Sequence, residues 1–278
     1  MICVRRATFT AAHTCHQPQR LPPEETDRLF GAAARPSPHG HDYRLELAVS
    51  GAIDPADGMV VNLTELKGIL RDVVIGELDH RFLNEDLPHF SDHSPSCENL
   101  LAYLWPRIEA RLPSRCRLER LLLRETDELS AELVRGEGAA RLMLVTRVYD
   151  FSASHRLHSP LLGAEENARI YGKCNRPNGH GHNYGVEVTV RGPVDPRTGI
   201  VIDVGLLDRI VNEEVIERYD HRHLNHDVDD FAGLSPTSEN VARAIFARIA
   251  GRIPRPAELH RVRLHETARN VFECHGED

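Results

Sequence analysis

The chain has 278 residues, of which 41% are hydrophobic and 27% are charged, and its formal net charge is −8 at pH 7. This composition is typical of a soluble globular protein that forms one large domain or two ordinary ones. So acidic a chain argues against nucleic acid as the main partner, and no apolar run approaches the roughly 20 residues that a membrane helix needs. Because the N-terminus lacks the apolar core of a signal peptide and the six cysteines follow no framework spacing, we expect a cytoplasmic protein with reduced thiols.

The first half of the chain begins with a strand-like run that ends at His13, followed by a loop rich in proline, glycine and polar residues. A second strand is predicted from His39-Gly40-His41 to about residue 49, and the Asp-Pro and Gly residues after it favour a turn. A helix follows, because Asn62 can cap it and four apolar residues recur at helical spacing. These are Leu66, Ile69, Leu70 and Val73.

A second helix is predicted to begin after Ser96, a favourable N-cap residue. Pro106 lies within it, and we expect this proline to kink the helix or to end it early. Two closing strands are predicted at about 118–124 and 129–134. The resulting order, β-β-α-α-β-β, predicts an α+β fold in which two helices cover one face of a four-stranded antiparallel sheet.

The second half of the chain repeats the motifs of the first half in the same order. The matched pairs are Phe9-Thr10-Ala11-Ala12-His13 with Phe151-Ser152-Ala153-Ser154-His155, His39-Gly40-His41 with His180-Gly181-His182, Asp79-His80 with Asp220-His221, Ser96-Cys97-Glu98-Asn99 with Thr237-Ser238-Glu239-Asn240, and Glu125-Thr126 with Glu266-Thr267. From His39 onward the two copies are offset by 141 residues (180 − 39). We therefore predict two modules, residues 1–138 and 139–278, whose bare sheet edges favour association with further copies.

Three histidines of the second half form a candidate metal site. His180 and His182 lie two residues apart at the start of a strand, so their side chains point to the same face, and His155 ends the preceding strand. Three imidazoles without a fourth protein ligand are typical of catalytic zinc, and Cys174 is close enough to act at the open position. An isolated His-X-His favours ordinary surface or core histidines, but the repetition of the set in the first half favours metal ligands. The repeated set is His13, His39 and His41.

The second half, residues 141–276, resembles 6-pyruvoyl-tetrahydropterin synthase and its relative 6-carboxy-tetrahydropterin synthase, and residues 1–136 resemble a diverged member. The resemblance is carried by Phe151-Ser152-Ala153-Ser154-His155, Lys173-Cys174-Asn175-Arg176-Pro177-Asn178-Gly179-His180-Gly181-His182-Asn183-Tyr184, Asp220-His221, Pro236-Thr237-Ser238-Glu239-Asn240 and Glu266-Thr267. It implies two tandem T-fold (tunnelling-fold) modules, a catalytic Zn2+ ion and the substrate 7,8-dihydroneopterin triphosphate. It also implies ring-shaped homo-oligomers with active sites at subunit interfaces.

The resemblance implies a role for each matching residue. The zinc ligands match His155, His180 and His182, the catalytic thiol matches Cys174, and the acid/base pair that a neighbouring module contributes matches Asp220 and His221. Glu266 matches the carboxylate that anchors the pterin ring. Thr237 lies in the loop that helps to hold the ring, although a helix cap explains this residue equally well.

The first module departs from the pattern at the thiol, where Ala33 replaces the cysteine. The ligand positions His13, His39 and His41 are retained, as are Asp79, His80 and the carboxylate Glu125. Cys15, two residues after His13, is a minor alternative as a substitute thiol. Our hypothesis is a division of labour in which the second module supplies zinc and Cys174, and the first lends Asp79 and His80 across an interface.

The resemblance implies a carbon-oxygen lyase that eliminates triphosphate from the pterin substrate, as in tetrahydrobiopterin biosynthesis. Five residues separate Cys174 from His180, as in the pyruvoyl-forming members. The first alternative is a 6-carboxy-tetrahydropterin synthase of the queuosine (deazapurine) pathway. The second alternative is a zinc- and pterin-binding scaffold without turnover, since one module has already lost its thiol.

Overall fold

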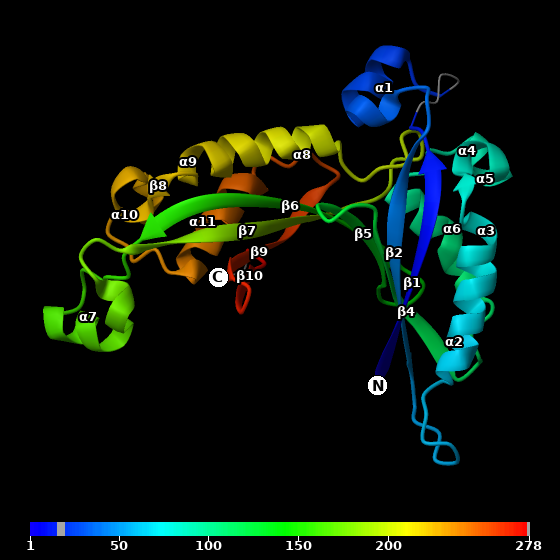
Figure 1. Cartoon of the computed structure of the whole chain (residues 1–278), viewed down its shortest axis with the longest axis horizontal. Helices are drawn as coiled ribbons and strands as arrows, with labels where there is room; N and C mark the ends of the chain where they lie inside the picture. The colour runs from blue at the N-terminus through cyan, green and yellow to red at the C-terminus, as the bar shows by residue number, and fades with distance from the viewer. Residues whose placement is uncertain (16–19, 277–278) are drawn as a thin grey trace. The chain divides into compact units, whose positions relative to one another are not determined.

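The computed structural model describes residues 1–15 and 20–276. Clustering of its contacts divides the chain into two compact units, shown with the rest of the fold in Figure 1. Unit 1 comprises Met1–Thr146 and Arg191–Gly205, and unit 2 comprises Arg147–Val190 and Leu206–Asp278. Unit 1 thus contains the first repeat together with residues 191–205, which belong to the second repeat.

The sheet of unit 1 is built from β1 (Ile2–His13), β2 (His39–Gly51), β4 (Cys116–Arg124) and β5 (Leu129–Arg135), paired antiparallel in that order. The strands β1 and β2 pair from Ile2 opposite Ser50 to His13 opposite His39. A short strand, β3 (Arg81–Phe82), pairs in parallel with the end of β1. This pairing brings the Asp79-His80 segment to the same end of the sheet as His13.

Two long helical segments cover this sheet. The first is α2 (Leu63–Leu70), which continues through a π-helical turn (Arg71–Ile75) into α3 (Gly76–Leu78), and the second is α6 (Cys97–Glu109). Asn62 and Ser96 cap the two segments as predicted, since their side chains accept the N–H groups of Thr64 and Asn99. The shorter helices of the unit are α1 (Pro23–Phe30), a 3-10 turn (Gly31–Ala34), α4 (Leu83–Asp86) and α5 (Pro88–Ser91).

The helix α6 packs on β4 and β5, and α2 packs on β1, so the core lies between the helices and one face of the sheet. The expected early end at Pro106 is wrong, because α6 continues to Glu109. Proline removes one backbone N–H, and near the C-terminal end of a helix this loss interrupts little of the remaining hydrogen-bond ladder. The largest fully buried side chains of unit 1 are Trp105, Tyr43, Phe90, Leu45, Leu47, Leu66, Leu78 and Leu83, with Leu21.

Unit 2 repeats this arrangement with the strand order β10-β9-β7-β6. The strands are β6 (Arg141–His155), which begins in unit 1, β7 (His180–Arg191), β9 (Glu258–Thr267) and β10 (Asn270–Cys274), with the short β8 (Arg222–His223) parallel to the end of β6. Its helices are α7 (Ala164–Tyr171), α8 (Val204–Val211), α9 (Glu217–Tyr219), α10 (Leu224–Asp227) and α11 (Ser238–Ala250), with 3-10 turns at Gly172–Asn175 and Asp229–Phe231 and a π-helical turn at Asn212–Ile216. The helix α11 packs on β9 and β10.

The predicted α+β fold and the order β-β-α-α-β-β are thereby confirmed in both repeats, as two tandem T-fold modules. The short strands β3 and β8 are additions that the sequence pattern did not predict. Within the described ranges, no helix combines the length and apolarity that crossing a bilayer requires.

Candidate metal and active site

His155, His180 and His182 meet at the end of the β6–β7 strand pair in unit 2. One ring nitrogen from each of the three histidines lies within 4.8 Å of the other two. The Nε2 atoms of His155 and His180 are 3.2 Å apart. Tetrahedral zinc with Zn–N bonds of about 2.0–2.1 Å separates its ligand nitrogens by about 3.3 Å, so these rings are already spaced for a metal ion.

Hydrogen bonding and burial prepare the rings of unit 2 to act as ligands. The Nδ1 atom of His155 lies 2.8 Å from the carbonyl oxygen of Pro236, so Nδ1–H donates to it and Nε2 is left with a lone pair toward the other rings. Burial lowers the pKa of His155 and of His180, which favours the neutral imidazole that a metal requires. Among the described residues, the buried Nε2 of His182 has no hydrogen-bond partner, as expected for an atom that coordinates a metal.

A glycine makes the close approach of these strands possible. Gly179, directly before His180, has φ of 67°, in the left-handed region that favours glycine. A Cβ atom at this position would lie 2.5 Å from the carbonyl oxygen of His155. The Asn-Gly-His sequence therefore sets where β7 begins and holds His180 beside His155.

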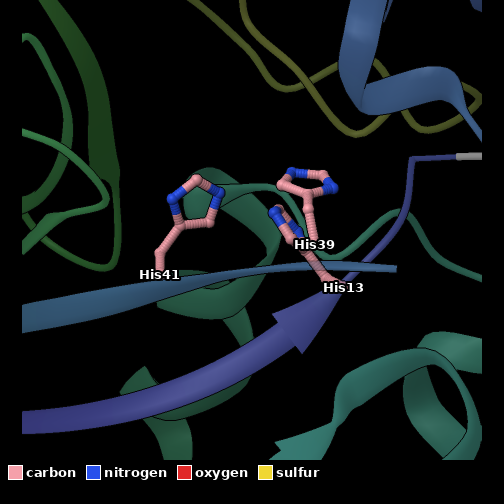
Figure 2. A group of neighbouring side chains, drawn as sticks. All are labelled: His13, His39 and His41. Carbon is pink, nitrogen blue, oxygen red and sulfur yellow. The ribbon is translucent and has the colours of Figure 1, made fainter. Parts of the chain in front are cut away.

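The first repeat has the same histidine cluster. His13 ends β1 opposite His39, which begins β2, and His41 follows two residues later on the same face, as Figure 2 shows. The ring centroids of the three histidines are 4.5 to 5.2 Å apart, and one ligand atom of each lies within 4.8 Å of the others. The Nδ1 atom of His13 lies 3.1 Å from the carbonyl oxygen of Pro95. Burial lowers the pKa of His13 to about 3, so this ring is neutral as well.

A carboxylate lies beside each histidine cluster. The Oε1 atom of Glu266 is 4.0 Å from His182 Nε2 and accepts the hydroxyl of Ser238 at 2.7 Å. Burial alone would raise the pKa of Glu266, but hydrogen bonds from Ser238 and Asn270 outweigh it and lower the pKa, so the group is ionised. Sequence reasoning missed Ser238, although its place beside Thr237 in a repeated motif was a usable signal.

The matching carboxylate of unit 1 is Glu125, whose Oε1 atom is 3.6 Å from His41 Nε2. Here Cys97 replaces Ser238 and donates its thiol to Glu125 at 3.5 Å. Thr237 and its counterpart Ser96 act as N-caps, with Thr237 accepting the N–H of Asn240 at 3.4 Å. Thr237 therefore acts as a helix cap, one of the two roles considered for this residue.

Each repeat also holds an aspartate–histidine pair in the same unusual conformation. The Nδ1 atom of His221 is 2.8 Å from Asp220 Oδ2, and His80 stands at the same distance from Asp79. Both histidines have a positive φ, 55° and 58°, which is uncommon outside glycine and clusters at functional sites. The backbone N–H groups of Ser152 and Thr10 are the main cause that lowers the pKa of Asp220 and of Asp79, respectively.

The segment that carries Cys174 is tied to the residues after His155. Leu157 donates its N–H to the carbonyl of Cys174 at 3.0 Å, and Arg156 donates to the neighbouring Asn175. In unit 1 the same backbone bond runs from Cys15 to Ala33 at 2.9 Å. The structure therefore places Ala33 where the second repeat has Cys174.

Cys15 takes the place of Leu157 rather than that of the thiol base. It is buried, and burial raises its pKa to about 12, so it stays protonated at neutral pH. These surroundings argue against Cys15 as a substitute for the missing thiol of the first repeat.

Comparison with known proteins points to one family. The family described as 6-pyruvoyl tetrahydropterin synthase matches residues 2–136 and again residues 144–277. The 6-pyruvoyl tetrahydrobiopterin synthase of Poecilia reticulata is 47% identical over 140 residues, which are 50% of this chain and 94% of the relative. A protein of Archaeoglobus fulgidus, named "Putative 6-carboxy-5,6,7,8-tetrahydropterin synthase", is 39% identical over 94 residues, covering 34% of this chain and 71% of the relative. The solved structure of Caenorhabditis elegans 6-pyruvoyl tetrahydropterin synthase is 42% identical, with a TM-score of 0.47, over 49% of this chain and 96% of that one.

Proposed function

Because the chain belongs to the 6-pyruvoyl tetrahydropterin synthase family, we propose that it is a zinc-dependent lyase that eliminates triphosphate from 7,8-dihydroneopterin triphosphate. The proposal rests on the second repeat. Three imidazoles converge there, an ionised carboxylate lies beside them, and the family model matches residues 144–277, which include Cys174. The first repeat keeps the three histidines, the carboxylate and the aspartate–histidine pair but has Ala33 in place of the thiol, so we assign turnover to the second repeat.

The histidines of unit 2 would hold the zinc ion, with the carbonyl of Pro236 fixing the His155 ring. Bound zinc supplies a Lewis acid that polarises the side-chain hydroxyls of the substrate. Glu266 would accept two parallel N–H donors from the pterin edge, a fork that one carboxylate can bind, while Ser238 and Asn270 hold its position. The loop beginning at Thr237 would support that end of the ring.

Cys174 would act as the base that removes a carbon-bound proton, and an aspartate–histidine pair would move the proton onward. Both pairs have the geometry for this role, because the aspartate fixes the histidine tautomer and holds its charge. We infer that Asp79 and His80 of a neighbouring first repeat serve the second-repeat site, since the chain keeps both pairs but only one thiol.

Product identity tests the reaction directly. We expect the 278-residue chain, incubated with 7,8-dihydroneopterin triphosphate, to release triphosphate and to form a 6-pyruvoyl product that mass spectrometry detects. The competing product is the 6-carboxy compound, the product in the name of the archaeal relative, and its mass differs from that of the 6-pyruvoyl product. Pterin binding without any conversion would show a scaffold and contradict the lyase assignment.

The two histidine clusters predict the metal content of the chain. We expect about two zinc ions per chain by elemental analysis, falling to about one in His155→Ala and in His13→Ala, because each change removes one of three ligands from one cluster. Substitution of His89, which lies in neither cluster, should leave the content unchanged. A content of one ion that only His155→Ala removes would show that the first cluster holds no metal.

The division of labour predicts unequal effects of two equivalent substitutions. We expect Asp79→Asn to lower kcat about 10²-fold, within the range for acid–base catalysis, and Asp220→Asn to have a much smaller effect. Steady-state kinetics with zinc content as a control for folding would measure both. Full activity in Asp79→Asn with loss in Asp220→Asn would contradict the hypothesis.

We also propose that the chains assemble head to tail, with a first repeat of one copy against a second repeat of the next. In unit 1 the loop that carries Glu98 is covered by residues 199–203 from the second repeat. Ser96 donates its hydroxyl to the Gly199 carbonyl at 2.5 Å, and Glu98 accepts the N–H of Val201 at 3.0 Å. Glu98 is buried by this contact.

Among the residues that the structure describes, none covers the matching loop of unit 2 in this way. Glu239, the counterpart of Glu98, is exposed, and Leu234 nearby is 52% exposed. The counterpart of residues 199–203 is residues 58–62 in the first repeat, where Met59 is 38% exposed. Gly58 and Gly199 close the same turn, each donating its N–H to an aspartate carbonyl at 2.7 Å. Each chain therefore has two copies of each contacting surface and joins only one pair of them internally. The other pair, residues 58–62 and the loop of Glu239, is left for contact with other chains.

A further inference from the structure

The helices α1 and α7 occupy equivalent places in the two repeats. They begin at Pro23 and Ala164, 141 residues apart (164 − 23), and each is followed by a glycine, Gly31 or Gly172, that begins a 3-10 turn. In the second repeat this turn carries Cys174. Figure 1 shows α7 beyond the ends of β6 and β7, apart from the helices that cover the sheet of unit 2. The position of α7 therefore bears directly on the position of the thiol.

In unit 1, α1 is held against residues 196–203 by two ion pairs. Arg197 donates to Glu25 Oε1 at 2.8 Å. Arg28 donates to Asp203 Oδ2 at 3.3 Å. Because both ends of the 196–203 segment are tied to the helix in this way, the contact fixes α1 relative to the rest of its unit.

The apolar side chains of the two helical segments differ in exposure. Leu29 of α1 is half-buried, whereas its counterpart Ile170 on α7 is 50% exposed. Leu21, just before α1, is buried, whereas its counterpart Leu162 is half-buried and follows Leu161, which is 91% exposed. The segment of α7 therefore exposes apolar side chains at positions that are shielded in the segment of α1.

Residues 196–203 differ from their first-repeat counterparts, residues 55–62, in the same way. Thr198 and Ile200 are buried, whereas their counterparts Asp57 and Met59 are exposed. Within the described structure the contact forms once in the chain, so one copy of each surface, α7 and residues 55–62, stays exposed. Exposed apolar surfaces of this kind mark interaction sites, and the internal contact shows that these two kinds of surface fit each other.

The exposed pair of surfaces is less charged than the internal pair. Within residues 55–62, Ala56 and Asn62 replace the arginine and the aspartate that bind α1. Glu166 of α7 pairs instead with Arg169 of the same helix, at 3.6 Å. A contact between these surfaces would therefore rest on apolar side chains. The exposed ones are Leu161, Ile170 and Met59.

The turn after α7 is tied to the strand that bears the first ligand of the histidine cluster. Leu157, two residues after His155, donates its N–H to the Cys174 carbonyl at 3.0 Å. Burial is the main cause that lowers the pKa of His180, and the charge of Lys173, the residue before Cys174, lowers it further. The turn thus lies within electrostatic range of the cluster, with α7 attached at its other end.

We propose that α7 of one copy docks on residues 55–62 of the next copy, and that this contact fixes the position of Cys174. The inference rests on the proposed function and gives the head-to-tail contact a role in the second-repeat site. The occupant is a second copy of this chain, because residues 196–203 show how the equivalent surface holds α1. Ile170 is then a positioning residue, since it acts on the thiol only through the turn.

Hydrogen–deuterium exchange followed by mass spectrometry tests the docking without requiring turnover. In the assembled, zinc-loaded chain we expect the amides of α7 to exchange as slowly as those of α1. Ile170→Lys should speed exchange of α7 at least about tenfold, because it opens the contact. Ala168→Lys is the matched control, since its counterpart Asp27 is exposed although α1 is docked. Lysine suits the C-terminal half of a helix, so neither change unfolds α7 by itself.

Fast exchange of α7 in the wild-type assembly, or equal effects of the two lysine variants, would overturn the docking. Restoring the ion pairs tests which surface α7 meets. Ala56→Arg with Asn62→Asp introduces the second-repeat residues, and aspartate caps α2 as well as asparagine does. We expect this variant to lower the dissociation constant of the assembly at least about twofold, measured by sedimentation. Glu166→Arg in that background should remove the gain, and a gain that persists, or none at all, would overturn the assignment of residues 55–62.

Turnover tests the positioning role at protein concentrations where sedimentation shows the assembly intact, so that separated copies do not explain a loss. We expect Ile170→Lys to lower kcat at least about tenfold with KM and zinc content unchanged, because a small misplacement of a catalytic group can cost about 10²-fold. Ala168→Lys should keep the wild-type rate. A normal kcat in an Ile170→Lys chain whose α7 exchanges fast would overturn the positioning role. A chain that protects α7 but never converts the pterin would instead refute the lyase and leave the docking standing.

Discussion

Replacing Cys174 with alanine is expected to lower kcat by about 10²–10⁴-fold, the range that a positioned acid or base contributes. The physical reason is that the proposed reaction begins with removal of a carbon-bound proton, and Cys174 is the group proposed to accept that proton. The zinc content and the affinity for the pterin should be unchanged, because none of the three histidines and neither Glu266 nor Ser238 is altered. Steady-state turnover together with elemental analysis measures both.

Cys116→Ala provides a matched control, since this half-buried cysteine lies on β4 opposite Gly51, at the end of β2 far from His39 and His41. The repeat also allows a reciprocal test. Ala33→Cys in the Cys174→Ala background should restore part of the activity, because the backbone bond from Cys15 to Ala33 reproduces that from Leu157 to Cys174. A Cys174→Ala variant that keeps more than a tenth of the wild-type rate would show that another group is the base.

The site could be predicted where its residues follow local rules. The two-residue period of a strand puts His180 and His182 on one face, and the capping preferences of Asn62 and Ser96 mark where two helices begin. Duplication strengthened these predictions, since each motif could be compared with its copy 141 residues away.

The remaining contacts join residues that are far apart in the chain. Pro236 is 81 residues from the His155 ring that it orients, and Glu98 is 103 residues from the N–H of Val201. No periodicity or propensity encodes such partners, because they depend on which loops the folded sheets bring together.

Head-to-tail assembly implies that the contact between copies is heterologous, with different surfaces on its two sides. The donor side is residues 58–62 of the first repeat, and the acceptor side is the loop of Glu239 in the second repeat, by analogy with Val201 on Glu98. Exposed apolar residues on two sheet-edge strands fit the same interface: Val4 on β1 is 46% exposed and Val271 on β10 is 41% exposed. Such contacts close into a ring when the rotation between successive copies permits it.

A mixing experiment on two variants tests this arrangement. Met59→Asp places a charge on the donor side, and Glu239→Lys removes the carboxylate of the acceptor side, so each variant alone is expected to lose the ring and sediment as a monomer. An equimolar mixture should form dimers and nothing larger, because one intact donor side and one intact acceptor side remain per pair. Sedimentation velocity distinguishes these species, and Glu128→Lys, on the exposed turn before β5, serves as a charge-matched control that should keep the wild-type assembly. A mixture that stays monomeric, or single variants that still assemble fully, would contradict the head-to-tail contact.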